Sequence, residues 1–256
     1  MKQIKKELSE TSHRKKRLSP SVKTDESGVT YTKKEGIKYT DTEKSISPAV
    51  VKRLPRYFRY LGDLMKNGIS KISSRELSEK MNVTASQIRQ DLNCFGGFGQ
   101  QGYGYNVAFL HDAISEILGI KNKYSAVIIG AGKLGSALAN HKLFEKSGVT
   151  VRSLFDVDER IIGTTVAGVP VRSMDEAENF CKENKIDIAV LTLPKAATQE
   201  TANKLASVGI YGFWNFANME LALPEYPNAK IENVHIGDSL MRLCYEMKSD
   251  ERLDEE

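Results

Sequence analysis

The chain carries, at residues 124–135, the stretch Tyr124-Ser-Ala-Val-Ile-Ile-Gly130-Ala-Gly-Lys-Leu-Gly135. Its apolar first half predicts a buried strand, and the glycine spacing that follows, G-x-G-x-x-G, is typical of a dinucleotide-binding turn. A helical pattern continues to Gly148, and a second apolar run ends at Asp156, 21 residues after Gly135. Strand, glycine turn, helix, strand and terminal acid together predict a doubly wound parallel sheet of the Rossmann type.

Each glycine has a physical role in such a turn. Gly130 makes the tight turn, Gly132 lets a pyrophosphate approach the backbone, and Gly135 lets the helix pack closely on the sheet. The free N–H groups at the start of the helix, with the positive end of its dipole, attract phosphates. Asp156 can hydrogen-bond an adenine ribose, and its charge would repel a 2′-phosphate, so we expect NAD(H) rather than NADP(H). A domain of the same fold that binds another nucleotide, or none, is the alternative.

Further apolar runs at 186–192 and 210–214 predict two more strands, with a helix at 198–208 between them. Strands that alternate with helices imply a parallel sheet, and such sheets bind ligands at the carboxyl ends of their strands. Residues at two of these ends are candidates for the nicotinamide side. The predicted cofactor-binding residues are Gly130, Ala131, Gly132, Lys133, Leu134, Gly135, Asp156, Thr192, Pro194 and Asn215.

The front half of the chain predicts a helix-turn-helix. Ser47-Pro48 begins a basic helix with an apolar stripe, in which Pro55 predicts a kink or a restart. Residues 73–76 (Ser-Ser-Arg-Glu) and 84–87 (Thr-Ala-Ser-Gln) each have the form of a capping box, a reciprocal pair of hydrogen bonds that starts a helix. Two short helices joined by about three residues form a helix-turn-helix, whose second helix enters the major groove of DNA.

A segment rich in glycine and aromatic residues, 95–107, follows the second helix. This alternation predicts a β-hairpin wing, because glycine permits turns and a close approach to a backbone. The helices and the wing together predict a winged-helix reader of duplex DNA. The predicted DNA-binding residues are Arg56, Ser73, Ser74, Ser86, Gln87, Arg89, Gln90, Gln100 and Gln101.

Charge is distributed unevenly along the chain. Residues 1–45 carry 12 Lys and Arg against 7 Asp and Glu, residues 46–125 carry 11 against 6, and residues 126–256 carry 14 against 20. A basic N-terminal half and an acidic C-terminal half indicate that only the N-terminal half binds a polyanion. The three Cys residues are scattered and no apolar run is long enough to span a bilayer, so we expect a cytoplasmic protein with no membrane partner.

These patterns divide the chain into four predicted segments. Residues 1–45 form a disordered basic arm, 46–123 the winged-helix domain, 124–236 the NAD(H)-binding domain, and 237–256 a final helix and an acidic tail. The final helix carries an apolar stripe that needs a partner surface. The stripe consists of Leu240, Leu243 and Met247.

The sequence offers no convincing catalytic machinery. A hydride-transfer enzyme needs a proton donor close to its substrate, but the four His residues are scattered along the chain. No cluster of side chains has metal-ligand spacing. We therefore expect neither a catalytic residue nor a metal site. An NAD-dependent dehydrogenase with an appended module that resembles a DNA-binding domain is the alternative from a different functional class.

Together these residues make the chain, from about Ile46 to about Lys248, similar to the Rex family of redox-sensing transcriptional repressors. The resemblance implies a homodimer whose final helix swaps onto the partner subunit. It also implies a switch in which NADH releases the protein from its operator, and this requires different NADH affinities in the two states. The resembling stretches are Leu54–Tyr57, Ile72–Leu77, Gln87–Arg89, Asp91-Leu92, Phe95-Gly96, Gly104–Val107, the glycine loop, Phe155–Asp158 and Asn215–Ala217.

Gln90, Gln100 and Gln101 stand where the family usually has basic residues. Three possible bonds to DNA phosphates are therefore missing, and the log–log salt slope of DNA binding falls by roughly 0.9 for each phosphate that is no longer neutralised. We hypothesise that the arm, residues 1–45, contributes to DNA affinity.

His235 stands where the family usually has an Asp. The resemblance pairs that Asp with an Arg and a Tyr, which match Arg59 and Tyr105, and so assigns these three positions to the coupling of NADH binding to DNA release. An imidazole cannot form the same charge pair with Arg59, although Asp238, one helical turn on, could substitute. A paralogue that binds DNA but has weakened or lost redox control is therefore a further alternative.

Overall fold

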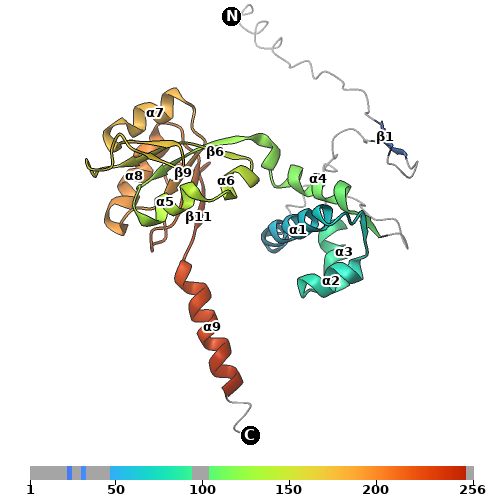
Figure 1. Ribbon diagram of the computed structural model, residues 1–256. Coiled ribbons are helices and arrows are strands. Elements are labelled where there is room, and N and C mark those ends of the chain that lie inside the picture. Colours follow the sequence, from blue (N-terminus) through green and yellow to red (C-terminus); the bar gives the residue numbers. More distant parts are fainter. Residues whose placement is uncertain (1–21, 25–29, 33–46, 94–103, 252–256) are drawn as a thin grey trace, which may run out of the picture. The chain divides into compact units, whose positions relative to one another are not determined.

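The computed structural model describes residues 22–24, 30–32, 47–93 and 104–251. The chain divides into two compact units, residues 1–114 and 115–256 (Figure 1). Within the described ranges, no helix is long and apolar enough to cross a membrane.

Between residues 47 and 117, the described part of the chain contains four helices and a small antiparallel sheet. The sheet joins β3 to β4, with Ile72 opposite Tyr105. This pairing brings the residues before the helix-turn-helix beside those after it, as a winged helix requires. The wing segment with Gln100 and Gln101 lies outside the described residues. The elements are α1 (Pro48–Lys66), β3 (Lys71–Ile72), α2 (Ser74–Met81), α3 (Ala85–Asn93), β4 (Tyr105–Asn106) and α4 (Val107–Ile117), which extends into unit 2.

Helix α1 runs without a break through Pro55, so the predicted restart is wrong. A proline inside a helix leaves the carbonyl of the residue four positions earlier without its N–H partner. That residue is Val51, and both Val51 and Pro55 are exposed on the helix surface. Water can therefore satisfy the carbonyl, while Leu54 and Tyr57 on the opposite face remain fully buried.

Residues 1–45 were predicted to contain no regular structure, and the structure differs at two places. Strand β1 (Val22–Thr24) pairs antiparallel with β2 (Thr30–Thr32), with Lys23 opposite Tyr31. Valine, threonine and tyrosine favour strands, but the segments are too short to show a clear period of two.

Unit 2 contains a seven-stranded sheet in the order β11-β10-β9-β5-β6-β8-β7. All neighbours are parallel except β7 and β8. The predicted parallel sheet is therefore confirmed, while β7, β8, β11 and helix α7 were not predicted. The strands are β5 (Tyr124–Ile129), β6 (Val149–Asp156), β7 (Thr165–Val166), β8 (Val169–Ser173), β9 (Ile188–Leu191), β10 (Gly212–Asn215) and β11 (Lys230–Asn233).

Helices pack on both faces of this sheet. Helices α5 (Lys133–Asn140) and α6 (Leu143–Lys146) pack on one face. Helices α7 (Ala177–Glu183) and α8 (Lys195–Ser207) pack on the other. The sheet thus has the layered core of a doubly wound fold.

A single helix was predicted between the glycine loop and Gly148, but the structure divides it. Helix α5 ends at Asn140, and the backbone of the next residue, His141, is extended (ψ 133°). The His141 Nδ1 accepts a hydrogen bond from the Leu143 N–H. This local bond replaces a helical one, so the chain restarts as α6. Gly148 has φ +69°, a left-handed conformation that glycine adopts without strain.

The predicted final helix is confirmed as α9 (Ile236–Glu251). Its large apolar side chains are more than half exposed, which is costly for a helix that stays alone in water. They are Ile236, Leu240, Met241, Leu243, Tyr245 and Met247.

Candidate nucleotide site and DNA-binding surface

The glycine loop of unit 2 connects β5 to α5 at the carboxyl edge of the sheet. Gly130 has φ +97°, and a Cβ there would lie 2.8 Å from the Thr192 carbonyl oxygen. A Cβ on Gly135 would overlap the Gly130 carbonyl oxygen. Both clashes are with backbone atoms, which cannot rotate away, so glycine is required at both positions.

Gly132 differs from its neighbours, because a Cβ at this position would meet no atom within 4 Å. It is the N-cap of α5 and provides no side chain to cap the first N–H groups. Lys133 is exposed, Leu134 is partly buried and Ala131 is buried. The open space and the uncapped helix start fit the predicted approach of a phosphate to this backbone.

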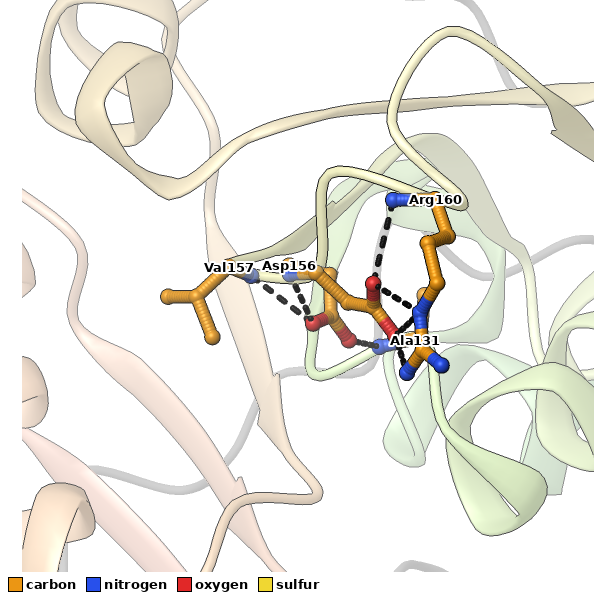
Figure 2. A network of polar contacts seen from close by, with 5 residues as sticks. Ala131, Asp156, Val157 and Arg160 are labelled. Atoms are coloured by element: carbon orange, nitrogen blue, oxygen red, sulfur yellow. Dashed lines mark hydrogen bonds and ion pairs between the residues drawn. The ribbon is translucent and has the colours of Figure 1, made fainter.

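Asp156, at the end of β6, holds the loop directly (Figure 2). Its Oδ2 accepts from the Ala131 N–H at 2.6 Å, and its Oδ1 accepts from the N–H groups of Val157 and Asp158 at 2.7 and 3.0 Å. A carboxylate has about four acceptor positions, so one remains for a ribose hydroxyl. Asp156 therefore both shapes the loop and can still accept the bond that the sequence predicts.

Arg160, four residues after Asp156, is paired with Asp158 (Figure 2). Its Nε and Nη2 donate to the two oxygens of Asp158 at 2.8 and 2.6 Å. The hydrogen bonds from Arg160 lower the pKa of Asp158 to about 2. Among the described residues, the Asp156 carboxylate bonds backbone N–H groups and Arg160 is held by Asp158, so the charge of Asp156 disfavours a 2′-phosphate.

Thr192 and Pro194 lie where β9 ends. The Thr192 hydroxyl is within 3.0 Å of the Ile129 carbonyl and 2.8 Å of the Gly130 carbonyl, so it can donate to either. Pro194 is the N-cap of α8. Thr192 therefore holds the turn of the glycine loop from the neighbouring strand, a positioning role that the sequence did not reveal.

Asn215 is fully buried, and its side chain bonds its own loop. Its Oδ1 accepts from the Ala217 N–H at 3.0 Å, and its Nδ2 donates to the Met219 carbonyl and to Asn233 Oδ1 at 2.9 and 2.8 Å. That Asn215 lines the nicotinamide side stays a prediction, and the structure shows its amide bonded to Met219, Ala217 and Asn233. It shapes the loop after β10.

A chain of polar contacts continues from Asn215 to His235. Asn233 Nδ2 donates to Glu220 Oε2 at 2.8 Å, and His235 Nε2 lies 2.9 Å from Glu220 Oε1. A carboxylate only accepts, so His235 must donate from Nε2. We name Asn215, Asn233, Glu220 and His235 the polar chain. It connects the ligand edge of the sheet to the residue that precedes α9.

The first predicted capping box of unit 1 is confirmed, and the second is half right. Ser73 Oγ accepts from the Glu76 N–H at 3.1 Å, and Glu76 Oε2 accepts from the Ser73 N–H at 2.7 Å. Thr84 Oγ1 accepts from the Gln87 N–H at 3.1 Å. The Gln87 side chain, however, turns to Asp91 instead of returning to Thr84.

Asp91 on α3 is the centre of a network that sequence reasoning missed. It is fully buried. Its Oδ2 accepts from Arg53 Nε at 2.7 Å and from the Tyr57 hydroxyl at 2.8 Å. Its Oδ1 accepts from Arg53 Nη2 and Gln87 Nε2, each at 2.8 Å. Three of these bonds, two from Arg53 and one from Tyr57, fix α3, the recognition helix, to α1, and the bond from Gln87 lies within α3.

The charge of Asp91 is stabilised despite its burial. Burial alone raises the pKa of a carboxyl, but the hydrogen bonds from Arg53, Gln87 and Tyr57 outweigh it and place the pKa of Asp91 below its ordinary value. Burial and the bond to Asp91 raise the pKa of Tyr57. Arg53, which the sequence placed largely off the apolar stripe, is thus a structural partner and not a free surface cation. An Asp within the apolar stripe of α3 was the available signal.

The remaining candidates of unit 1 differ in exposure, and Ser73 and Ser74 are partly buried. Arg56, Ser86, Arg89 and Gln90 are exposed. Arg89 Nη1 donates to Ser74 Oγ at 3.2 Å, which links α3 to the first residue of α2.

The three predicted coupling residues lie on different elements. Arg59 is exposed on α1, and Tyr105 on β4 is buried, which raises its pKa. His235 belongs to unit 2 and bonds Glu220 there.

Comparison with known proteins places both units in one family. Residues 121–219 match the family described as "CoA binding domain", and residues 45–93 match "Putative DNA-binding protein N-terminus". A redox-sensing transcriptional repressor Rex from Clostridium botulinum is 49% identical over 207 residues, covering 81% of this chain and 98% of the relative. The chain belongs to the Rex family. A Rex repressor from Thermoanaerobacter pseudethanolicus is 50% identical over 206 residues, covering 80% of this chain and 91% of the relative.

Solved structures of a Rex-family repressor, RSP, agree with this assignment. RSP in complex with β-NAD⁺ and operator DNA matches with a TM-score of 0.76 and 50% identity, covering 82% of this chain and 96% of RSP. RSP in complex with β-NADH matches with a TM-score of 0.75 and 46% identity, covering 83% and 99%. The predicted family is confirmed. The predicted fold, an N-terminal DNA-binding domain followed by a Rossmann-type domain, is confirmed as well. The named relatives are transcriptional repressors, as expected for a regulator that is not an enzyme.

Proposed function

We propose that this protein is a transcriptional repressor that binds operator DNA when NADH is scarce and leaves it when NADH binds. The observation that carries the proposal is about 50% identity, over four-fifths of the chain, to repressors named redox-sensing. RSP was solved with NAD⁺ and operator DNA, and separately with NADH. A regulator of this kind would act on DNA in the cytoplasm.

The nucleotide would lie against the glycine loop. Gly132 leaves space beside the first N–H groups of α5, where a pyrophosphate would bind, and Asp156 retains one acceptor position for the ribose. Coenzyme A and NAD both contain an adenosine joined to a pyrophosphate, so the CoA-binding description and this geometry point to the same half of the ligand. The negative charge of Asp156 favours NAD(H) over NADP(H).

Operator DNA would meet the start of α3. In helix-turn-helix proteins the first residues of the second helix touch base edges. Ser86, Gln87, Arg89 and Gln90 lie on this helix, and Ser73 and Ser74 lie at the start of α2, where Arg89 bonds Ser74. Arg56 on α1 adds an exposed cation.

A homodimer would cover the apolar side chains of α9. The same unit has a hollow on the outer strands of the sheet, lined by Ile188, Trp214 and Ile231 together with Lys230 and Glu232. A second copy of α9 has the apolar stripe to cover such a surface. In this proposal Leu243→Asp gives a monomer by sedimentation, and a variant that remains a dimer contradicts it.

A Rex-type repressor with weakened redox control is the second candidate, and one observation favours it. The His235 ring is bonded to Glu220, at the position where the resemblance to the family implies an Asp. An imidazole held by Glu220 cannot replace the carboxylate that the family pairs with an Arg. NADH binding and DNA binding would then both persist, with little coupling between them.

Fluorescence anisotropy tests the proposal with the full chain and the operator duplex that binds RSP, titrated with NADH and separately with NAD⁺ at one salt concentration. Release at much lower NADH than NAD⁺ supports a redox-sensing repressor. Tight DNA binding that neither NADH nor NAD⁺ weakens supports the second candidate. Turnover of NADH with a 2-oxo acid would instead show an enzyme and contradict both.

A further inference from the structure

The Gln87 side chain is held in one orientation by a buried carboxylate. Asp91 has about four acceptor positions, and all four are filled by two bonds from Arg53, one from Tyr57 and one from Gln87. If Gln87 turned away, a lone pair of a fully buried carboxylate would lose its partner, at a substantial cost. Gln87 is therefore fixed on α3 before any DNA arrives.

The identity of the partner decides which amide atom of Gln87 is bound. An ionised carboxylate can only accept hydrogen bonds, so Gln87 must donate from Nε2, as the 2.8 Å contact to Asp91 Oδ1 has it. The amide retains the acceptor Oε1 and one N–H. Gln87 is the third residue of α3 and is partly exposed, in the turn that meets base edges in helix-turn-helix proteins.

We propose that Gln87 is a specificity-determining residue that reads adenine, and that Asp91 is the positioning residue that sets this preference. Adenine offers the N7 acceptor and the N6 donor in the major groove, which complement one N–H and one acceptor oxygen. Guanine offers two acceptors, N7 and O6, so one of them would face Oε1 without a hydrogen. The inference rests on the proposed function, because it needs α3 in the major groove.

The test starts from a selection that assumes no operator sequence. The purified full chain selects from duplexes randomised over about 20 base pairs, a length that holds two half-sites one helical turn apart. Each position of the selected duplex is then replaced by the other three base pairs, and affinity is measured by anisotropy. We expect one position in each half-site at which adenine is preferred roughly tenfold over guanine.

Three variants assign this preference to Gln87. Gln87→Met has a similar length without polar groups, so it should remove the adenine preference at that position only. Gln87→Glu offers acceptors alone and places a second carboxylate beside Asp91, so it should also lose the adenine preference. Asn93→Met makes the matched change at the exposed last residue of the same helix and should keep the wild-type preference.

Asp91→Asn tests the positioning role. An Asn side chain can donate as well as accept, so Gln87 can turn over, and discrimination between adenine and guanine should narrow while DNA is still bound. If this variant does not fold, the two Gln87 variants still test whether Gln87 reads adenine. An unchanged preference in Gln87→Met overturns the inference and leaves the proposed function intact. Failure of the wild-type chain to select any duplex rejects the proposed function, and this inference with it.

Discussion

In unit 2 the groups that would meet the ligand are backbone N–H groups, whereas in unit 1 they are side chains on a helix. The loop is placed by local sterics, since Gly130 and Gly135 allow a close approach of backbone segments that no other residue permits. The recognition helix is placed by Asp91, which bonds Arg53 and Tyr57, 38 and 34 residues earlier. The nucleotide site therefore tolerates few substitutions within the glycine loop. The DNA-binding surface, in contrast, can be disturbed by substitutions at buried residues such as Asp91, away from the surface itself.

The largest expected effect is that of Gly135→Ala. Its Cβ would overlap the Gly130 carbonyl, so we expect unit 2 to lose roughly 3 kcal/mol or more of unfolding free energy. Trp214, the single tryptophan, lies on β10 and reports on unit 2 by fluorescence. Urea unfolding followed at this signal should shift, and NADH binding should disappear. An unshifted transition would show that the loop is not sterically constrained.

Gly132→Ala is the matched control for that variant. A Cβ at Gly132 meets nothing within 4 Å, so unfolding should change little. NADH affinity should still fall by about tenfold or more, because a methyl group keeps the pyrophosphate from the backbone. Calorimetric titration measures this, and unaltered affinity would move the pyrophosphate away from Gly132.

Asp91→Asn is expected to have the next largest effect, confined to unit 1. The neutral amide loses the charge pair with Arg53, whose side chain is 29% exposed and can turn to water, so we expect a loss of about 1–3 kcal/mol. The far-ultraviolet circular dichroism transition of unit 1 should shift while the Trp214 transition does not. A shift of both transitions would mean that the two units unfold together, and it would contradict the expectation that this substitution affects unit 1 alone.

The stability from Asp91 should also depend on pH in a defined direction. The pKa of Asp91 is lowered in the folded state, so its charge stabilises unit 1 above the unfolded carboxyl pKa of about 4. This contribution disappears as pH falls through the lower, folded pKa. The difference in unfolding free energy between the wild type and Asp91→Asn should therefore shrink between pH 7 and pH 3. A constant difference would contradict this assignment.

A smaller effect is expected from Glu220→Ala, which interrupts the polar chain. Asn233 and His235 each lose a hydrogen bond, while the glycine loop and α3 are untouched. We expect the NADH concentration that releases DNA to change by a few-fold, with the affinities for NADH alone and DNA alone unaltered. Anisotropy and calorimetry measure these three quantities. Equal changes in all of them would indicate general destabilisation instead.

The smallest effect should come from deletion of residues 1–45. This segment carries a net charge of +5, so its removal should weaken DNA binding and lower the log–log salt slope by roughly 0.9 for each phosphate that the arm neutralises. Anisotropy at several salt concentrations measures the slope. Unchanged binding at low salt would reject a role of the arm in DNA affinity.

The two units also differ in how far their sites could be predicted. Gly130, Gly135 and Asp156 were predicted correctly in their positions, because a turn needs certain residues at fixed spacing. The Asp91 network was missed: an Asp within the apolar stripe of α3 signals a buried carboxylate, but the sequence does not indicate which three residues of two helices bond it. Gln87 was predicted as a capping side chain, but the structure turns it to Asp91. The bonds of the buried Asn215 amide to its own loop were not predicted.

The sequence by itself determined the Rossmann sheet, the glycine loop, the helix-turn-helix and the exposed stripe of α9, because each follows from local spacing, periodicity or capping. The tertiary structure decided where individual polar side chains find their partners. It gave Asp91 its four donors, paired Arg160 with Asp158 and placed His235 on Glu220. Hydrogen bonds between distant segments depend on how helices and strands pack in three dimensions. A local sequence pattern does not determine that packing.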